Sequence, residues 1–171
     1  MATNSVYLQG KAKWVRVATP DMYGKYAMVL YPNEESLDKI KKLKEIQTIN
    51  GRQYEGLKNR LRRDEDGDNM AFGCHAEKII KGVRRLYAAP MLLDKDNLPI
   101  HVGVGNGSEV TIKLEVYSYN PPGAKMGGTA ARLVSIRVDK LVPYDASMAG
   151  NMGEPKEIRG FSKVPADNPL F

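Results

Sequence analysis

The stretch that decides the fold runs from Glu109 to Tyr119 and reads EVTIKLEVYSY. Aliphatic side chains occupy alternate positions along it: Val110, Ile112, Leu114 and Val116. The positions between them carry charged or hydroxyl-bearing side chains: Glu109, Thr111, Lys113, Glu115, Tyr117 and Tyr119. Alternation with a period of two predicts a β-strand that has one face in a core and the other face open.

The open face of this strand carries a lysine and two tyrosines, an unusual choice for a surface that meets only water. Lys113, Tyr117 and Tyr119 would lie on it together. Such a face suits a single-stranded nucleic acid, because cations attract phosphates and any base can stack on an aromatic ring. The alternative is that the two tyrosines cover a hydrophobic flank or pack under a loop.

Loops flank this strand, and a second strand follows it. A glycine-rich turn at residues 103–108 enters the strand, and a loop with prolines, glycines and Lys125 leaves it at residues 120–128. Residues 129–142 are predicted to return as a strand whose inward side chains are Val134, Ile136 and Val138. The two strands and their loops would form one surface.

The rest of the chain is predicted to supply further strands and one helical insertion. Strands are expected at residues 11–17, 23–31, 70–74, 83–88 and 91–93. Asn33 is a candidate N-cap for a helix over residues 34–46, and a second helix is expected near residues 53–62. Five or six strands with few parallel βαβ units predict a mainly β fold, a small and mostly antiparallel barrel with one helical insertion.

We expect three regions along the chain. Residues 1–10 would form a loose leader, residues 11–144 the folded domain, and residues 145–171 a flexible tail. The tail is rich in glycine, proline, serine, asparagine and charged residues, without a periodic hydrophobic pattern. Such a composition is typical of chain that packs against no core.

Composition limits the classes of protein that fit. The 171 residues carry a net charge of +6, and 42% of them are hydrophobic. This length supports one domain with a real core, and the basic excess suits a polyanionic partner. Cys74 is the only cysteine, which excludes an internal disulfide and favours a reducing compartment. With no apolar run of about 20 residues and no secretion signal, we expect a cytoplasmic protein that binds no membrane.

The motifs for catalysis and metal binding do not fit. An acidic run at residues 64–68 resembles the start of a calcium loop, which needs glycine at its sixth position and glutamate at its twelfth. Those positions hold Asn69 and His75. Cys74 and His75 are adjacent, and neighbours in a strand point to opposite faces, so they do not suit a nucleophilic pair. We expect no enzymatic activity, no metal site and no cofactor.

A second candidate binding cluster surrounds Trp14. Lys13 and Arg16 lie beside it in the sequence, and Lys25 lies within the next predicted strand, residues 23–31. A ring among cations is typical of a single-strand binding surface, but this tryptophan can equally belong to a core. Three other basic clusters are each typical of a solvated face: Lys39/Lys41/Lys42/Lys44, Lys58/Arg60/Arg62/Arg63 and Lys78/Lys81/Arg84/Arg85.

A series of short motifs spans most of residues 11–142. They are Ala18-Thr19-Pro20-Asp21, Gly24-Lys25-Tyr26, Tyr31-Pro32-Asn33, Leu98-Pro99-Ile100, Gly103 to Ser108, Val110 to Tyr119 and Ala131 to Val142. In this order they resemble the single-stranded DNA-binding proteins of lytic tailed phages. The resemblance implies an OB-fold, a five-stranded antiparallel Greek-key barrel that binds single strands across one face and its rim loops. It also implies a non-enzymatic role in phage DNA replication, recombination and repair, with polymerase and helicase as partners.

The resemblance gives roles to individual residues. Tyr119 falls where the family places an aromatic residue that binds DNA, and Pro121 stands where a second aromatic is expected. Tyr117 is the candidate substitute for that second ring. The full predicted DNA-binding set is Tyr119, Tyr117, Lys113, Lys125, Trp14, Lys13, Arg16 and Lys25.

The C-terminus matches the family in one respect and departs from it in another. Family members end in a long acidic segment closed by phenylalanine. This chain ends in Phe171, but basic residues nearly balance the acidic ones over residues 145–171. Phe171 is predicted to bind a protein partner, because a ring can fill a pocket while a basic residue binds the terminal carboxylate. The alternative is an untethered terminus.

Other functions and assemblies stay open. The chain could be a small β-rich virion or assembly protein that uses its basic surface for protein contacts. A nucleotide-processing enzyme that uses Cys74 is a third reading. A homo-oligomer is also compatible with the sequence.

Overall fold

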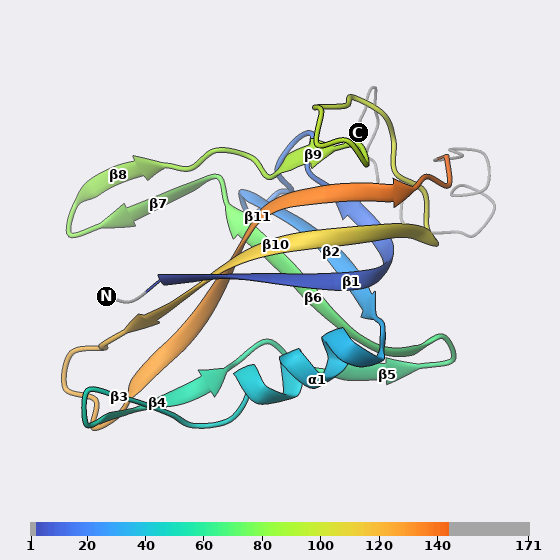
Figure 1. Ribbon diagram of the computed structural model, residues 1–171. Helices are drawn as coiled ribbons and strands as arrows, with labels where there is room; N and C mark the ends of the chain where they lie inside the picture. Colours follow the sequence, from blue (N-terminus) through green and yellow to red (C-terminus); the bar gives the residue numbers. More distant parts are fainter. Residues whose placement is uncertain (1–2, 144–171) are drawn as a thin grey trace.

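The computed structural model describes residues 3–143 and shows a mainly β chain with one helix (Figure 1). The five longest strands are β1 (Thr3–Arg16), β2 (Lys25–Pro32), β6 (Gly67–His75), β10 (Ser108–Tyr119) and β11 (Gly127–Lys140). The helix is α1 (Glu34–Leu43). The described residues also form six shorter strands: β3 (Gln47–Ile49), β4 (Arg52–Leu57), β5 (Arg62–Asp64), β7 (Glu77–Ile80), β8 (Val83–Leu86) and β9 (Met91–Leu93).

The prediction of a mainly β chain with one helical insertion is confirmed, but the five-stranded closed barrel is wrong. The main sheet has nine strands in the order β3-β4-β11-β10-β1-β2-β6-β5, and β9 pairs with β11. Most neighbours are antiparallel, whereas β4 and β9 each pair with β11 in parallel. β6 lies close to β11, but within residues 3–143 no ladder joins them, so the sheet does not close.

The alternating stretch of β10 forms the centre of the core, as predicted. Val110, Ile112, Leu114 and Val116 are all buried. Side chains from the strands on either side of β10 and from β2 and β6 pack against them: Leu8, Leu133, Ile136, Val138, Met28, Leu30, Met70 and Phe72. This single cluster holds β1, β2, β6, β10 and β11 together, and it fixes which face of β10 is open.

The prediction of a loose leader at residues 1–10 is wrong for residues 3–10. Residues 3–10 belong to β1, which pairs with β10 from Thr3 opposite Tyr117 to Ala12 opposite Ser108. Leu8 is completely buried in the core. Gly10 is the one position of this segment where a side chain is excluded, because a Cβ there would collide with the backbone of Tyr31 and Pro32.

The helix begins where the sequence predicts it. The Asn33 side chain accepts a hydrogen bond from the Ser36 amide at 2.9 Å, which satisfies one of the free donors of the first turn. Ile40 is completely buried and anchors α1 to the core. The second helix expected near residues 53–62 is wrong, because residues 52–57 form β4 beside the start of β11.

No helix in the described part of the chain is long and apolar enough to cross a membrane.

Candidate nucleic-acid interface

Tyr119 is the last residue of β10 and lies opposite Gly128 of β11. Its ring lies directly against the Gly128 backbone, since a Cβ added at Gly128 would be 2.8 Å from the ring Cε1 and 2.5 Å from Oη. The side chain is half-buried, so part of the ring remains accessible. The absence of a side chain at Gly128 therefore leaves room for the ring at the end of β10.

A surface hollow of about 330 Å³ adjoins this ring. Lys125 from the loop between β10 and β11 and Lys58 from the end of β4 line the same hollow as Tyr119. Lys58 Nζ lies 3.5 Å from a carboxylate oxygen of Glu55, and both side chains are mostly exposed. Exposed ion pairs of this kind contribute little, so Lys58 can exchange Glu55 for another anion. The hollow combines one aromatic ring with two lysines and the Glu55 carboxylate.

Tyr117 lies two residues before Tyr119 on the same face and is also half-buried. Burial raises the pKa of its phenol, and the nearby Tyr87 and Tyr119 add to the increase. The Arg132 guanidinium lies 5.9 Å from the centre of the Tyr87 ring and donates to Glu115 Oε1 at 3.2 Å. Tyr117 therefore lies near two other tyrosines, and it is half-buried as Tyr119 is.

Lys113 continues this face away from the hollow. It lies between Tyr7 of β1 and Ser135 of β11, and it is half-buried. The Tyr7 side chain beside it is 51% exposed. The open face of β10 thus carries Lys113, Glu115, Tyr117 and Tyr119 in a row, as the alternation predicted.

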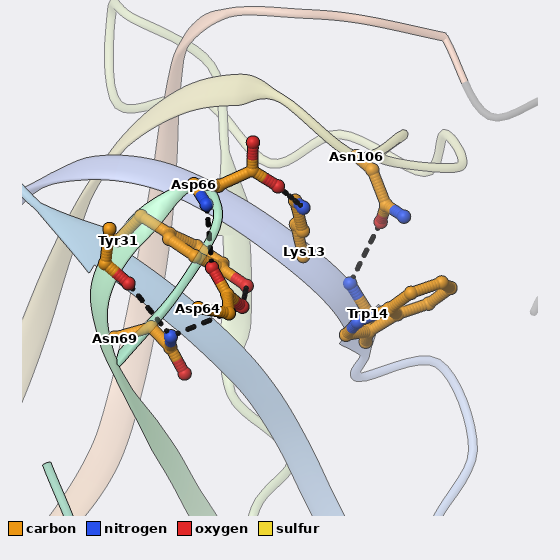
Figure 2. A network of polar contacts seen from close by, with 8 residues as sticks. Lys13, Trp14, Tyr31, Asp64, Asp66, Asn69 and Asn106 are labelled. Atoms are coloured by element: carbon orange, nitrogen blue, oxygen red, sulfur yellow. Dashed lines mark hydrogen bonds and ion pairs between the residues drawn. The ribbon is translucent and has the colours of Figure 1, made fainter. Parts of the chain in front are cut away.

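The cluster around Trp14 lies elsewhere. β1 runs antiparallel to β10, so Ala12 pairs with the first residue of β10, whereas Tyr119 is the last. Trp14 and Tyr119 are therefore at opposite ends of this strand pair. The Trp14 ring is 50% exposed, so the core alternative is wrong. Its backbone has a φ of 54° and its amide donates to Asn106 Oδ1 at 2.9 Å (Figure 2).

Lys13 belongs to a network of polar contacts of its own. Its ammonium forms an ion pair with Asp66 and lies 4.9 Å from the centre of the Tyr31 ring, whose hydroxyl donates to Asp64 (Figure 2). The bond to Asp66 raises the pKa of Lys13. The hydrogen bond from Tyr31 lowers the pKa of Asp64. In the free protein Lys13 is thus paired with acidic neighbours.

Arg16 and Lys25 do not line the hollow. Arg16 is half-buried opposite Ala27 of β2. Lys25 is exposed and pairs with His75 at the end of β6, where the chain leaves the sheet for β7. Burial lowers the pKa of His75, and the positive charges of Lys78 and Lys25 lower it further. Of the eight predicted residues, only Tyr119 and Lys125 line the hollow.

Sequence reasoning missed Lys58, Tyr87, Arg132 and Gly128 as parts of this surface. The Gly127-Gly128 pair after a proline-rich loop was a usable signal, since adjacent glycines often mark close approach of other groups. Lys58 stood in one of the basic clusters. Tyr87 and Arg132 had no local signal, because only the sheet brings β11 next to the segment after β8.

Cys74 and His75 do not form a reactive pair in this structure. They are consecutive residues of β6, and Cys74 is buried whereas His75 is half-buried. Burial raises the pKa of the Cys74 thiol, which disfavours the thiolate. Among residues 3–143 no group of three or more His, Cys, Asp or Glu side chains could hold a metal ion. Phe171 lies outside the described residues.

The fold is similar to that of a solved phage single-stranded DNA-binding protein, in line with the resemblance seen in the sequence. That protein is gp2.5, a single-stranded DNA-binding protein encoded by bacteriophage T7. It is 18% identical, with a TM-score of 0.58 over 95% of this chain and 100% of that chain. Another match is the single-stranded DNA-binding protein of bacteriophage Enc34, which is 12% identical, with a TM-score of 0.49 over 89% of this chain and 90% of that chain.

At these identities the similarity concerns the fold alone. No protein-family model matches the chain, and no curated protein matches it in sequence.

Proposed function

We propose that this protein binds single-stranded DNA without sequence specificity, through an OB-type fold. The observation that carries the proposal is the hollow in which the half-exposed Tyr119 ring lies beside Lys58 and Lys125. Lysines displace counterions from phosphates, and the ring stacks on a base at a gain of about 1–3 kcal/mol. Neither contact reads the edge of a base, so the binding tolerates any sequence.

The same proposal extends to the cellular role. The protein would coat single strands in the host cytoplasm during phage DNA replication, recombination and repair, without catalysing a reaction. Polymerase and helicase are the expected partners, with Phe171 as the point of contact. Self-association on DNA would be compatible with this role. Support for the extension comes from the T7 protein of similar fold, which is a single-stranded DNA-binding protein.

A gel-shift comparison tests the proposal. The full-length protein is mixed with a labelled single strand and, separately, with the duplex of the same sequence. We expect the single strand to shift at a lower protein concentration, with little dependence on base composition. Co-purification with phage particles in place of DNA binding would favour a virion or assembly protein and overturn the proposal.

A further inference from the structure

The β7–β8 hairpin projects from the body of the molecule (Figure 1). Its two-residue turn has positive φ at Lys81 and Gly82, 51° and 78°, as tight hairpin turns require. Ile79 and Leu86 are 73% and 72% exposed, so the hairpin packs little apolar surface against the core. A hairpin without such packing is only marginally stable in water. Contacts with a binding partner would stabilise such a hairpin.

The hairpin carries an excess of positive charge. Its cations are Lys78, Lys81, Arg84 and Arg85, and its only carboxylate is Glu77, which pairs with Arg84 at 2.8 Å. Lys78 lies directly opposite Arg85, so the two side chains share one face of the hairpin. Like charges in directly opposed positions destabilise a strand pair. Neither side chain has an ion-pair partner within the described part of the chain.

This positive face continues onto the body at the base of the hairpin. Lys25 lies opposite His75, and the Ala76 amide donates to the Gly24 carbonyl at 2.7 Å, which brings the turn before β2 against the start of β7. The Tyr23 ring in that turn is 79% exposed. Asp21 is the nearby carboxylate, and its Oδ1 already accepts from the amides of Tyr23 and Lys25. Cations and an open ring thus meet where the hairpin joins the sheet.

An aromatic row connects the base of the hairpin to the hollow. The Tyr87 amide donates to the Ala76 carbonyl at 2.9 Å, so Tyr87 closes the hairpin at its base. The Arg132 guanidinium lies 5.9 Å from the centre of the Tyr87 ring and donates to Glu115 at 3.2 Å. Glu115 precedes Tyr117 and Tyr119 on the same face of β10. In Figure 1 the hairpin and the loop between β10 and β11 lie toward the same side of the view, with the end of β10 between them.

We propose that the basic face of the β7–β8 hairpin, Lys78 and Arg85 together with Lys25, binds phosphates of the same single strand that stacks on Tyr119. This inference rests on the proposed function and extends its binding site past the hollow. The DNA would run from Tyr119 past Tyr117 and Tyr87 to the hairpin. Its phosphates would neutralise the Lys78–Arg85 repulsion, so the hairpin becomes more stable in the complex than in the free protein.

The test compares two double variants with equal loss of charge. Lys78→Gln with Arg85→Gln removes the opposed pair, and Lys41→Gln with Lys42→Gln removes two exposed lysines from the last turn of α1. Affinity for oligothymidines of about 4 and about 16 nucleotides, the range that one OB-fold covers, is measured by fluorescence anisotropy from low to high salt. Lys78→Arg, which keeps the charge, serves as the conservative variant.

We expect the hairpin variant to lose affinity for the longer strand only. Removing two phosphate contacts should make the slope of log K against log salt shallower by about 1.4. If the variant and the wild type bind equally at 1 M salt, the variant should then bind about 25-fold more weakly than the wild type at 0.1 M salt. The α1 variant and Lys78→Arg should bind like the wild type. The Tm of the hairpin variant should not fall, because a repulsive pair has been removed.

Several results would overturn the inference. One is an unchanged slope for the hairpin variant while the wild type still binds, and this would leave the proposed function intact. Another is an equal loss from the α1 variant, which would reduce the effect to net charge. A third is a hairpin variant whose sedimentation mass differs from that of the wild type while its DNA affinity is unchanged, which would mean that the hairpin contacts a second copy of the protein. A wild type that binds no single strand would refute the proposed function as well.

Discussion

Tyr119 is the residue on which the binding proposal depends most. Replacing it with alanine should weaken single-strand binding by about 1–3 kcal/mol, roughly 5- to 150-fold, because the stacking surface is lost. Tyr119→Phe should bind like the wild type, since stacking needs the ring and not the hydroxyl. Anisotropy titrations give the affinities, and thermal unfolding checks the fold.

Two outcomes would contradict this role. If Tyr119→Ala unfolds the domain, the half-buried ring is part of the core. If Tyr119→Phe loses as much affinity as Tyr119→Ala, the hydroxyl makes the decisive contact and stacking is the wrong mechanism.

Substitutions at the adjacent Gly127 and Gly128 of β11 should affect DNA affinity and the free energy of unfolding separately. A Cβ at Gly128 would collide with the far end of the Tyr119 ring, which can swing outward, so Gly128→Ala should weaken DNA binding and largely preserve the fold. A Cβ at Gly127 would collide with the buried ring of Tyr54 and approach the Tyr119 carbonyl, so Gly127→Ala should lower the free energy of unfolding. Urea unfolding and anisotropy on both variants give the comparison. The same effect from both would show that the two rings are not separately positioned.

At the scale of elements, β1 is expected to be essential to the fold. Leu8 is completely buried, so Leu8→Ala should cost about 2–5 kcal/mol of unfolding free energy. Tyr7 is half exposed on the other face, and Tyr7→Ala should cost much less. Urea unfolding of both variants measures the difference. Equal and small losses would mean that this end of the chain is the loose leader that the sequence indicated.

The strands that follow strict alternation were predictable, and the irregular ones were not. β10 could be placed from its pattern because every inward position is aliphatic. Lys113 of β10 pairs with Ser135 of β11, whereas the next residue, Leu114, pairs with Leu133. Val134 is therefore an extra residue in β11: Leu133 is buried in the core and Val134 is half-buried. A bulge of this kind changes the phase of alternation, and the sequence carries no sign of its position.

The sequence did not predict the N-terminal half of β1 or the β4 strand, for a different reason. Residues 3–10 contain small and polar residues that individually favour turns, and their pairing with β10 outweighs that preference. Residues 52–57 take strand geometry from the neighbouring β11 and β3. Both segments pair with strands that are distant in sequence, β10 for residues 3–10 and β11 for residues 52–57.

At the scale of the whole molecule, part of the site followed from the sequence. The row of Lys113, Tyr117 and Tyr119 follows from period-two alternation, and Lys125 follows from its place in the next loop. The structure separates the Trp14 cluster from this row, because adjacent strands run in opposite directions. The hairpin and Lys58 join the surface only through the folding of the chain.

The described core should fold without the C-terminal segment. A chain that ends at Tyr144 keeps every core residue and also the Val142 contacts, in which its amide donates to Ser108 Oγ at 2.8 Å and its carbonyl accepts from Gly105. We expect this truncation to fold and to bind single strands. Because residues 145–171 carry a net charge of only −1 by sequence, the gain in affinity should be less than about tenfold, or 1.4 kcal/mol.

Loss of Phe171 alone should reproduce most of any loss in partner binding. Pull-downs with replication proteins and DNA titrations on the full chain, the truncation and the Phe171 deletion provide the comparison. A truncation that misfolds would make the C-terminal segment part of the domain. Unchanged partner capture without Phe171 would leave it an untethered end.

In the proposed complex, cations around a stacking ring hold the single strand. The most direct test of this proposal is the affinity of the full-length protein for one single strand and for its duplex, each measured over a series of salt concentrations. We predict tighter binding of the single strand and a linear fall of log K with log salt, with a slope of about −0.7 for each phosphate neutralised. Lys58→Gln combined with Lys125→Gln should make that slope shallower by about 1.4. Binding that is independent of salt, or a preference for the duplex, would contradict the account.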